Sequence, residues 1–71
     1  MSVSDKTTDH LIRMANQIAA NLAVRGEAVA IAETADHIAK FWDPRMKAAI
    51  AAAPREGLSP IARAAIEKGA A

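Results

Sequence analysis

The chain has 71 residues, of which 52% are hydrophobic and 24% charged, and its net charge is +1 with both histidines neutral. This length allows one small domain, the lack of cysteine excludes disulfides and iron–sulfur ligation, and the mixed charges give no basic footprint for nucleic acid. No segment approaches the roughly 20 apolar residues of a membrane span, and the polar N-terminus lacks the apolar core of a secretory signal, so we expect a soluble, cytoplasmic protein.

The first predicted element is a helix over about residues 9–25, preceded by a polar segment, residues 1–7, that we expect to form a flexible arm. Thr8 is a suitable N-cap, and Asp9 places a negative charge where the helix dipole favours one. Gly26 suits the position just past the last turn. One face of this helix carries apolar residues at helical spacing, namely Leu11, Ala15, Ile18 and Leu22.

A second helix is predicted over about residues 27–42. Its apolar face is rich in alanine, which allows neighbouring helices to approach closely, and comprises Ala28, Ile31, Ala35, Ile38 and Trp42. Because the link at Gly26 is short, we expect the first two helices to form an antiparallel hairpin.

Proline marks the start of two shorter helices. Asp43 is pushed towards an extended backbone by the following proline and is a good N-cap, while Pro44 suits the first helical position. A third helix is therefore predicted over about residues 44–53. The same pattern at Ser59 predicts a fourth helix over about residues 60–68. The expected fold is all-α, in a single small helical domain.

The small supply of large apolar side chains indicates that the chain needs a partner. Much of its hydrophobic share is alanine, which shields little area. Full burial of a large apolar side chain contributes about 1.5–3 kcal/mol, whereas ordering each residue costs about 1.5 kcal/mol, so the two sums nearly cancel. With no disulfide available, we expect the fold to be stabilised by binding another chain or by self-association.

The sequence offers no catalytic or metal-binding motif. It contains no glycine-rich phosphate loop, no His-Glu-x-x-His motif and no cysteine nucleophile. Glu33 and His37 lie four residues apart with Asp36 beside them, but two or three ligands do not complete a structural zinc site, which needs four. A solvated helix face explains these residues more simply, and we expect no catalytic residue, cofactor or metal in this chain.

Two segments are candidates for binding a partner. The junction after the second helix contains the only tryptophan, and tryptophan and arginine are enriched among residues that dominate interfaces; its candidates are Phe41, Trp42, Asp43, Arg45 and Met46. An equally weighted alternative is that Trp42 fills the chain's own small core. On the first helix, Arg13, Asn16 and Gln17 share a polar face that offers directional hydrogen bonds, although composition alone favours an ordinary solvated surface.

Three segments resemble a known family. They are Leu11–Ala19 (LIRMANQIA), Ala35–Met46 (ADHIAKFWDPRM) and Leu58–Ala65 (LSPIARAA). Together they resemble the delta subunit of NAD-dependent formate dehydrogenase over most of residues 11–66. The string FWDPRM at this distance from MANQI is the most specific part of the resemblance, whereas the alanine-rich stretches are not specific.

The resemblance implies a small cytoplasmic subunit of a soluble enzyme that oxidises formate to carbon dioxide and reduces NAD. In such complexes the alpha subunit holds a bis-molybdopterin guanine dinucleotide (bis-MGD) with molybdenum or tungsten and iron–sulfur clusters. The beta and gamma subunits carry FMN and further clusters to the NAD site. The delta subunit of this family holds no cofactor and is thought to help assemble or stabilise the complex.

We therefore expect a non-catalytic accessory subunit that docks on the alpha subunit and supports assembly, cofactor insertion or stability. Two alternatives stay open at this point: a self-associating helical regulator, and a maturation chaperone that leaves after assembly. A helix-turn-helix DNA binder would contact phosphates through Arg45, Lys47, Arg55 and Arg63. The nearly balanced charge disfavours it.

Overall fold

The computed structural model describes residues 3–70, and the side chains of residues 7–69. Within that range the chain forms four α-helices and two short 3-10 helices, and no strand. In chain order they are α1 (Val3–Leu22), η1 (Ala23–Arg25), α2 (Glu27–Phe41), α3 (Pro44–Ala52), η2 (Arg55–Gly57) and α4 (Pro60–Ala70). The predicted all-α fold is confirmed.

Helix α1 begins at Val3, well before the predicted start at residue 9. The helix thus includes residues 3–7 of the segment predicted to form a flexible arm, and residues 1–2 lie outside the described residues. Thr8 lies inside the helix and does not cap it. No glycine or proline stands between residues 3 and 8, so nothing in the backbone stops the helix from extending into a polar segment.

The turn between α1 and α2 depends on one glycine. Gly26 has φ 102° and ψ 150°, a region that residues with a Cβ atom rarely adopt. Its N–H donates to the carbonyl of Ala23 at 3.1 Å, which closes η1. The predicted helix over 9–25 therefore ends as an α-helix at Leu22 and tightens into η1 before the chain reverses.

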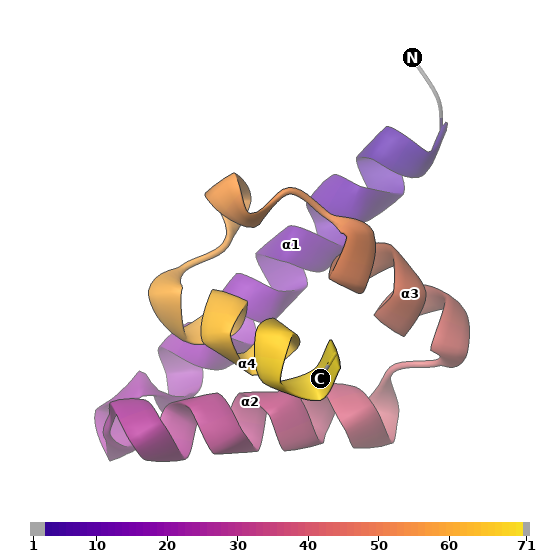
Figure 1. Cartoon of the computed structure of the whole chain (residues 1–71). Helices are drawn as coiled ribbons and strands as arrows, with labels where there is room; N and C mark the ends of the chain where they lie inside the picture. Colours follow the sequence, from indigo (N-terminus) through magenta and orange to yellow (C-terminus); the bar gives the residue numbers. More distant parts are fainter. Residues whose placement is uncertain (1–2, 71) are drawn as a thin grey trace.

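Helices α1 and α2 diverge from this turn, and α4 lies against both of them (Figure 1). The most extensive contact between two helices is that of α2 with α4, whereas α3 runs from the far end of α2 back to α1. The expected hairpin of α1 and α2 is thus an open V, closed by the last helix of the chain. Ala62 and Ala65 are fully buried in α4, and their small side chains allow this close approach.

The core is thin and built largely from alanine and a few branched side chains. Ala15, Ala30 and Ala62 have no exposed surface. The core cluster contains the larger side chains Leu11, Ile38, Trp42, Ile50, Leu58 and Ile66 together with Ala15, Ala19, Ala53 and Ala62. Thr34 is the one fully buried polar side chain among the described residues, and its hydroxyl oxygen has no hydrogen-bond partner.

Candidate partner-binding surface

The corner between α2 and α3 is fixed by one backbone–backbone hydrogen bond, one side-chain cap and one buried ring. Trp42 leaves the helix with an extended backbone (φ −88°, ψ 138°), and its N–H donates to the carbonyl of Ile38 at 3.1 Å. Its side chain is only 5% exposed and belongs to the core. Asp43 then caps α3, because its Oδ1 accepts the N–H of Met46 at 2.8 Å. Trp42 therefore fills this chain's own core, which is one of the two roles considered for it.

Phe41 lies on the opposite side of this corner and is 72% exposed. Its ring stands against that of His37, with the ring centres 4.8 Å apart. Lys47 crosses from α3 to α2 and donates to the carbonyl of Ala39 at 3.1 Å, which further fixes the two helices. The corner thus presents an aromatic ring to solvent from a backbone that is held on both sides.

Met46 and Arg45, the other two residues predicted at this corner, also differ in their exposure. Met46 is half-buried and packs against the core. Arg45 is exposed, and no ion pair or hydrogen bond holds its guanidinium within the described part of the chain. Arg45 is therefore available to a carboxylate on another protein.

On α1, Asn16 binds the loop that precedes α4. Its Nδ2 donates to the carbonyl of Gly57 at 2.9 Å, and its Oδ1 accepts the N–H of Ser59 at 2.8 Å. Both donor and acceptor sides of the amide are used within the chain. Arg13 and Gln17, by contrast, are exposed on the same helix. The polar face predicted on α1 is thus one structural amide flanked by two solvent-facing side chains.

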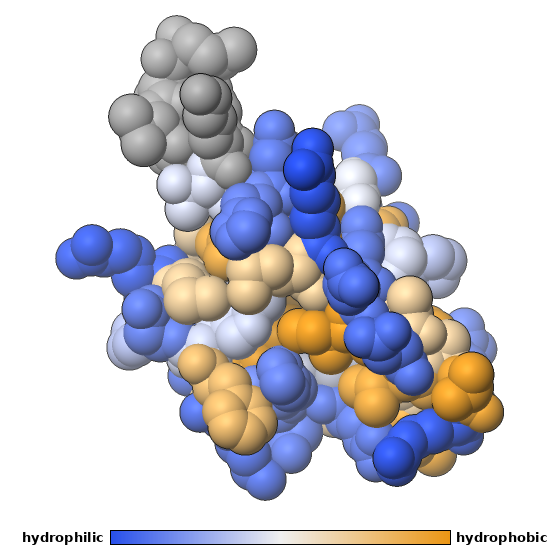
Figure 2. Space-filling view, turned by 180° about the vertical axis from the view of Figure 1, so that it is seen from behind, coloured by the Kyte–Doolittle hydropathy of each residue, from blue (hydrophilic) through white to orange (hydrophobic). Residues whose placement is uncertain are grey.

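The eight predicted residues therefore fall into two groups. Four have roles inside the fold: Asn16, Trp42, Asp43 and Met46. Four remain at the surface and are here called the exposed candidates: Arg13, Gln17, Phe41 and Arg45. Figure 2 shows one face of the molecule, on which apolar side chains appear in separate groups among hydrophilic ones.

Two apolar features were missed by reasoning from the sequence. Val24 is 90% exposed in η1, and Val29 is 44% exposed on α2. The position of Val24, two residues before Gly26, could have indicated its exposure, since a residue in a tight turn has little to pack against.

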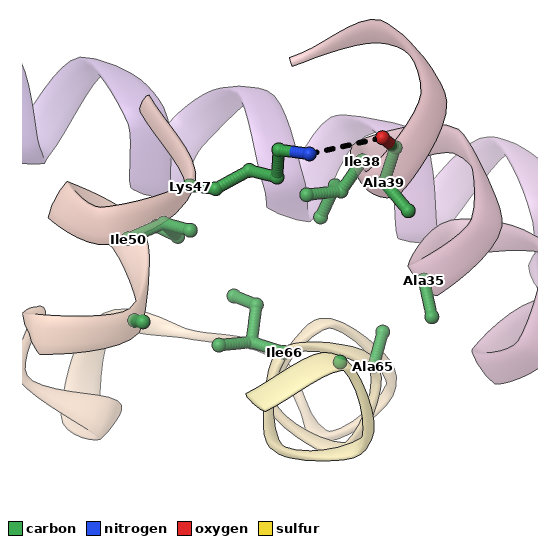
Figure 3. A pocket seen from close by; sticks show the side chains of 9 residues that line it. Ala35, Ile38, Ala39, Lys47, Ile50, Ala65 and Ile66 are labelled. Atoms are coloured by element: carbon green, nitrogen blue, oxygen red, sulfur yellow. Dashed lines mark hydrogen bonds between the residues drawn. The ribbon is translucent and has the colours of Figure 1, made fainter. Parts of the chain in front are cut away.

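The second feature is an apolar pocket of about 100 Å³ between α2, α3 and α4 (Figure 3). No local pattern could reveal it, because three separate helices line it.

The acidic residues considered for a metal are engaged elsewhere. Glu33 pairs with Arg25 at 3.3 Å, and Asp36 pairs with Lys40 at 3.1 Å. No group of three or more histidine, aspartate or glutamate side chains suited to a metal ion occurs in the described part of the chain. None of its helices combines the length and apolar character required to cross a bilayer.

Comparison with known proteins decides the family. The family model described as NADH-dependent formate dehydrogenase delta subunit matches residues 10–66. The chain belongs to this family. The match to the delta-subunit family includes the α2–α3 corner and all four exposed candidates, and it ends within α4. No curated protein and no solved structure matches the chain.

A delta subunit is one chain of a multi-subunit enzyme, so membership of this family makes the chain a formate dehydrogenase subunit. The resemblance inferred from the sequence is confirmed by the match. The segments that carried the resemblance now have physical roles, because Asn16 closes a loop and Trp42 with Asp43 forms the corner.

Proposed function

We propose that this delta subunit is a non-catalytic accessory chain that docks in the cytoplasm on the cofactor-bearing alpha subunit of formate dehydrogenase. In this proposal the other subunits hold the bis-MGD with molybdenum or tungsten, the iron–sulfur clusters, the FMN and the NAD site. The delta chain supports assembly, cofactor insertion or stability of the alpha subunit. The beta and gamma subunits belong to the same complex.

The observation that carries the proposal is the exposure of Phe41 on a fixed corner. A phenylalanine that is 72% exposed leaves apolar area in water, and covering it would contribute about 2 kcal/mol. Because Trp42 and Asp43 already hold the backbone, little conformational entropy is lost when a partner covers the ring. Arg45, which has no partner among the described residues, supplies a charge that fixes orientation.

Because the core of the delta chain is small, docking should also affect the stability of this chain. A ligand that binds only the folded state stabilises that state by mass action. Binding on the alpha subunit would therefore stabilise the delta chain as well as its host. The same coupling lets the delta chain hold part of the alpha subunit in the shape that accepts its cofactor.

Co-purification tests this proposal. A tagged delta chain is co-expressed with the alpha subunit, and the amount of alpha subunit retained is compared between variants. We expect Phe41→Ala together with Arg45→Ala to reduce retention strongly, whereas Arg63→Ala, an exposed arginine on α4, leaves it unchanged. Trp42 is unsuitable as a probe because its replacement would damage the core. Failure of the unmodified chain to retain the alpha subunit would contradict the proposal.

Two measurements separate the alternatives. Light scattering on the delta chain alone distinguishes docking from self-association, since a stable homodimer favours the regulator. The molar ratio of delta to alpha subunit in the active enzyme distinguishes a resident subunit from a transient chaperone. We expect one delta chain per alpha subunit and no stable homodimer.

A further inference from the structure

The apolar pocket between α2, α3 and α4 differs from the corner around Phe41 in being concave. Its floor consists of Ile38, Ile50 and Ile66, each at most 7% exposed. The buried Ala65 lies among them. The other small lining residues leave the centre open, namely Ala35, Ala39, Ala51 and Gly69. Figure 3 shows the labelled side chains surrounding an open space, with Lys47 along one side.

The pocket has the size of one aliphatic side chain. Its volume is about 100 Å³, and apolar cavities of roughly 150 Å³ in other proteins admit benzene. Side chains from three helices form its wall, as in the holes that receive a knob from a packed helix. A leucine or methionine side chain therefore fits its dimensions and its chemistry.

Charge at the rim further restricts the occupant. Lys47 donates one hydrogen bond, to the carbonyl of Ala39, and an ammonium group has three donors. The acids on the surrounding elements are already engaged: Asp36 pairs with Lys40, Asp43 caps α3, and Glu67 pairs with Arg55 and Arg63. The positive charge of Lys47 is therefore uncompensated by any carboxylate in the described part of the chain.

We infer that this pocket receives a leucine or methionine side chain of another formate dehydrogenase subunit, next to an aspartate or glutamate that pairs with Lys47. The inference rests on the proposed function, since it requires a partner subunit. The pocket would be a second contact with the partner subunit, separate from that at Phe41. The carboxylate would lie about one helical turn from the inserted side chain, where residues three or four apart share a face.

Filling the pocket from within tests the inference. Gly69 lines the pocket, and an added Cβ there meets no atom within 4 Å, so Gly69→Leu adds a flexible side chain at the pocket without a clash at Cβ. Ala39→Leu fills the same space from α2. The matched control is Ala48→Leu, an exposed alanine on α3 that does not line the pocket.

The readouts are retention of the enzyme's other subunits by the tagged full chain, and the melting temperature of the chain. We expect each filled variant to lose about tenfold or more in affinity while its melting temperature stays equal or rises. Ala48→Leu should bind as the unmodified chain does. Lys47→Gln keeps a donor for Ala39 but removes the charge, so we expect affinity to fall about threefold and its salt dependence to flatten.

Full retention of the partner by both filled variants would overturn the inference while leaving the proposed function intact. Loss of helix content in both filled variants would also count against it, because filling an empty pocket should not unfold the chain. A second copy is the other occupant to consider, with Val24 as the inserted residue. Self-association of the chain alone that the filled variants abolish would assign the pocket to that copy and overturn the inference.

Discussion

Ser59 donates its backbone N–H to Oδ1 of Asn16 at 2.8 Å, although the two residues lie 43 positions apart. The same amide donates to the carbonyl of Gly57 at 2.9 Å, so one side chain satisfies two backbone groups of the loop between α3 and α4. This loop determines where α4 begins, and α4 closes the V formed by α1 and α2. Asn16 is therefore a positioning residue for the last helix.

Replacement of Asn16 should destabilise the fold. Asn16→Ala removes both hydrogen bonds and leaves two backbone groups of the loop unpaired, and we expect a loss of about 1–3 kcal/mol in the free energy of unfolding. Urea denaturation followed by circular dichroism measures it. The neighbouring Gln17→Ala changes an exposed amide and should stay within about 0.5 kcal/mol. Equal effects of the two substitutions would contradict the role assigned to Asn16.

The two adjacent aromatic residues should respond in opposite ways. Trp42→Ala empties a buried site and should cost about 3–5 kcal/mol of stability, which leaves a domain of this size largely unfolded. Phe41→Ala should change stability by no more than about 0.5 kcal/mol, because its ring is mostly in water. Its effect should appear in retention of the alpha subunit.

The fluorescence of the single tryptophan provides the readout for this pair. A buried indole emits at shorter wavelength than one in water, so the folded chain and Phe41→Ala should share a blue-shifted maximum. Trp42→Phe keeps a ring in the core and should be less destabilising than Trp42→Ala in circular dichroism. A red-shifted maximum in the folded chain would contradict the burial of Trp42.

Thr34 offers a substitution that should stabilise the protein. Its side chain is fully buried, and its hydroxyl oxygen has no hydrogen-bond partner. Thr34→Val replaces that hydroxyl with a methyl group of similar shape, and we expect about 1 kcal/mol of added stability in thermal or urea unfolding. Thr34→Ala serves as the comparison, because it removes the hydroxyl but also leaves a small cavity. A loss of stability in Thr34→Val would indicate a bonding partner for the hydroxyl.

Arg55 should contribute more to the stability of the fold than Arg63, with which it shares Glu67. Its guanidinium donates to the carbonyls of Ala51 and Ala53 at 3.0 Å each, at the C-terminal end of α3, and pairs with Glu67 at 3.5 Å. Hydrogen bonds to the last carbonyls of a helix satisfy groups that lack intrahelical donors. We expect Arg55→Ala to cost about 1.5–3 kcal/mol in urea denaturation.

Arg63→Ala is the matched control, because Arg63 shares only Glu67 and both side chains are largely exposed. An exposed pair one helical turn apart contributes about 0.3–0.5 kcal/mol. If the two arginine variants unfold at the same urea concentration, the cap at the end of α3 is not what Arg55 provides.

Local signals in the sequence determined the elements and the family. Asp43 and Pro44 act through a cap and a fixed φ within three residues, and Gly26 acts through its own backbone, so both could be recognised without knowing the fold. The start of α1 was missed because a polar composition resembles an arm when no stop signal is present. The motifs around Asn16 and Trp42 indicated the family even though their roles were not yet visible.

Tertiary structure alone decided which of those residues face inward. Phe41 and Trp42 are adjacent in sequence, and their different exposure follows from the way the chain leaves α2 and meets α1 and α4. Asn16 finds partners more than 40 positions away, and the pocket exists only where α2, α3 and α4 meet. Helix periodicity specifies a stripe on each helix, but burial depends on which stripes come together, and that is a property of long-range packing.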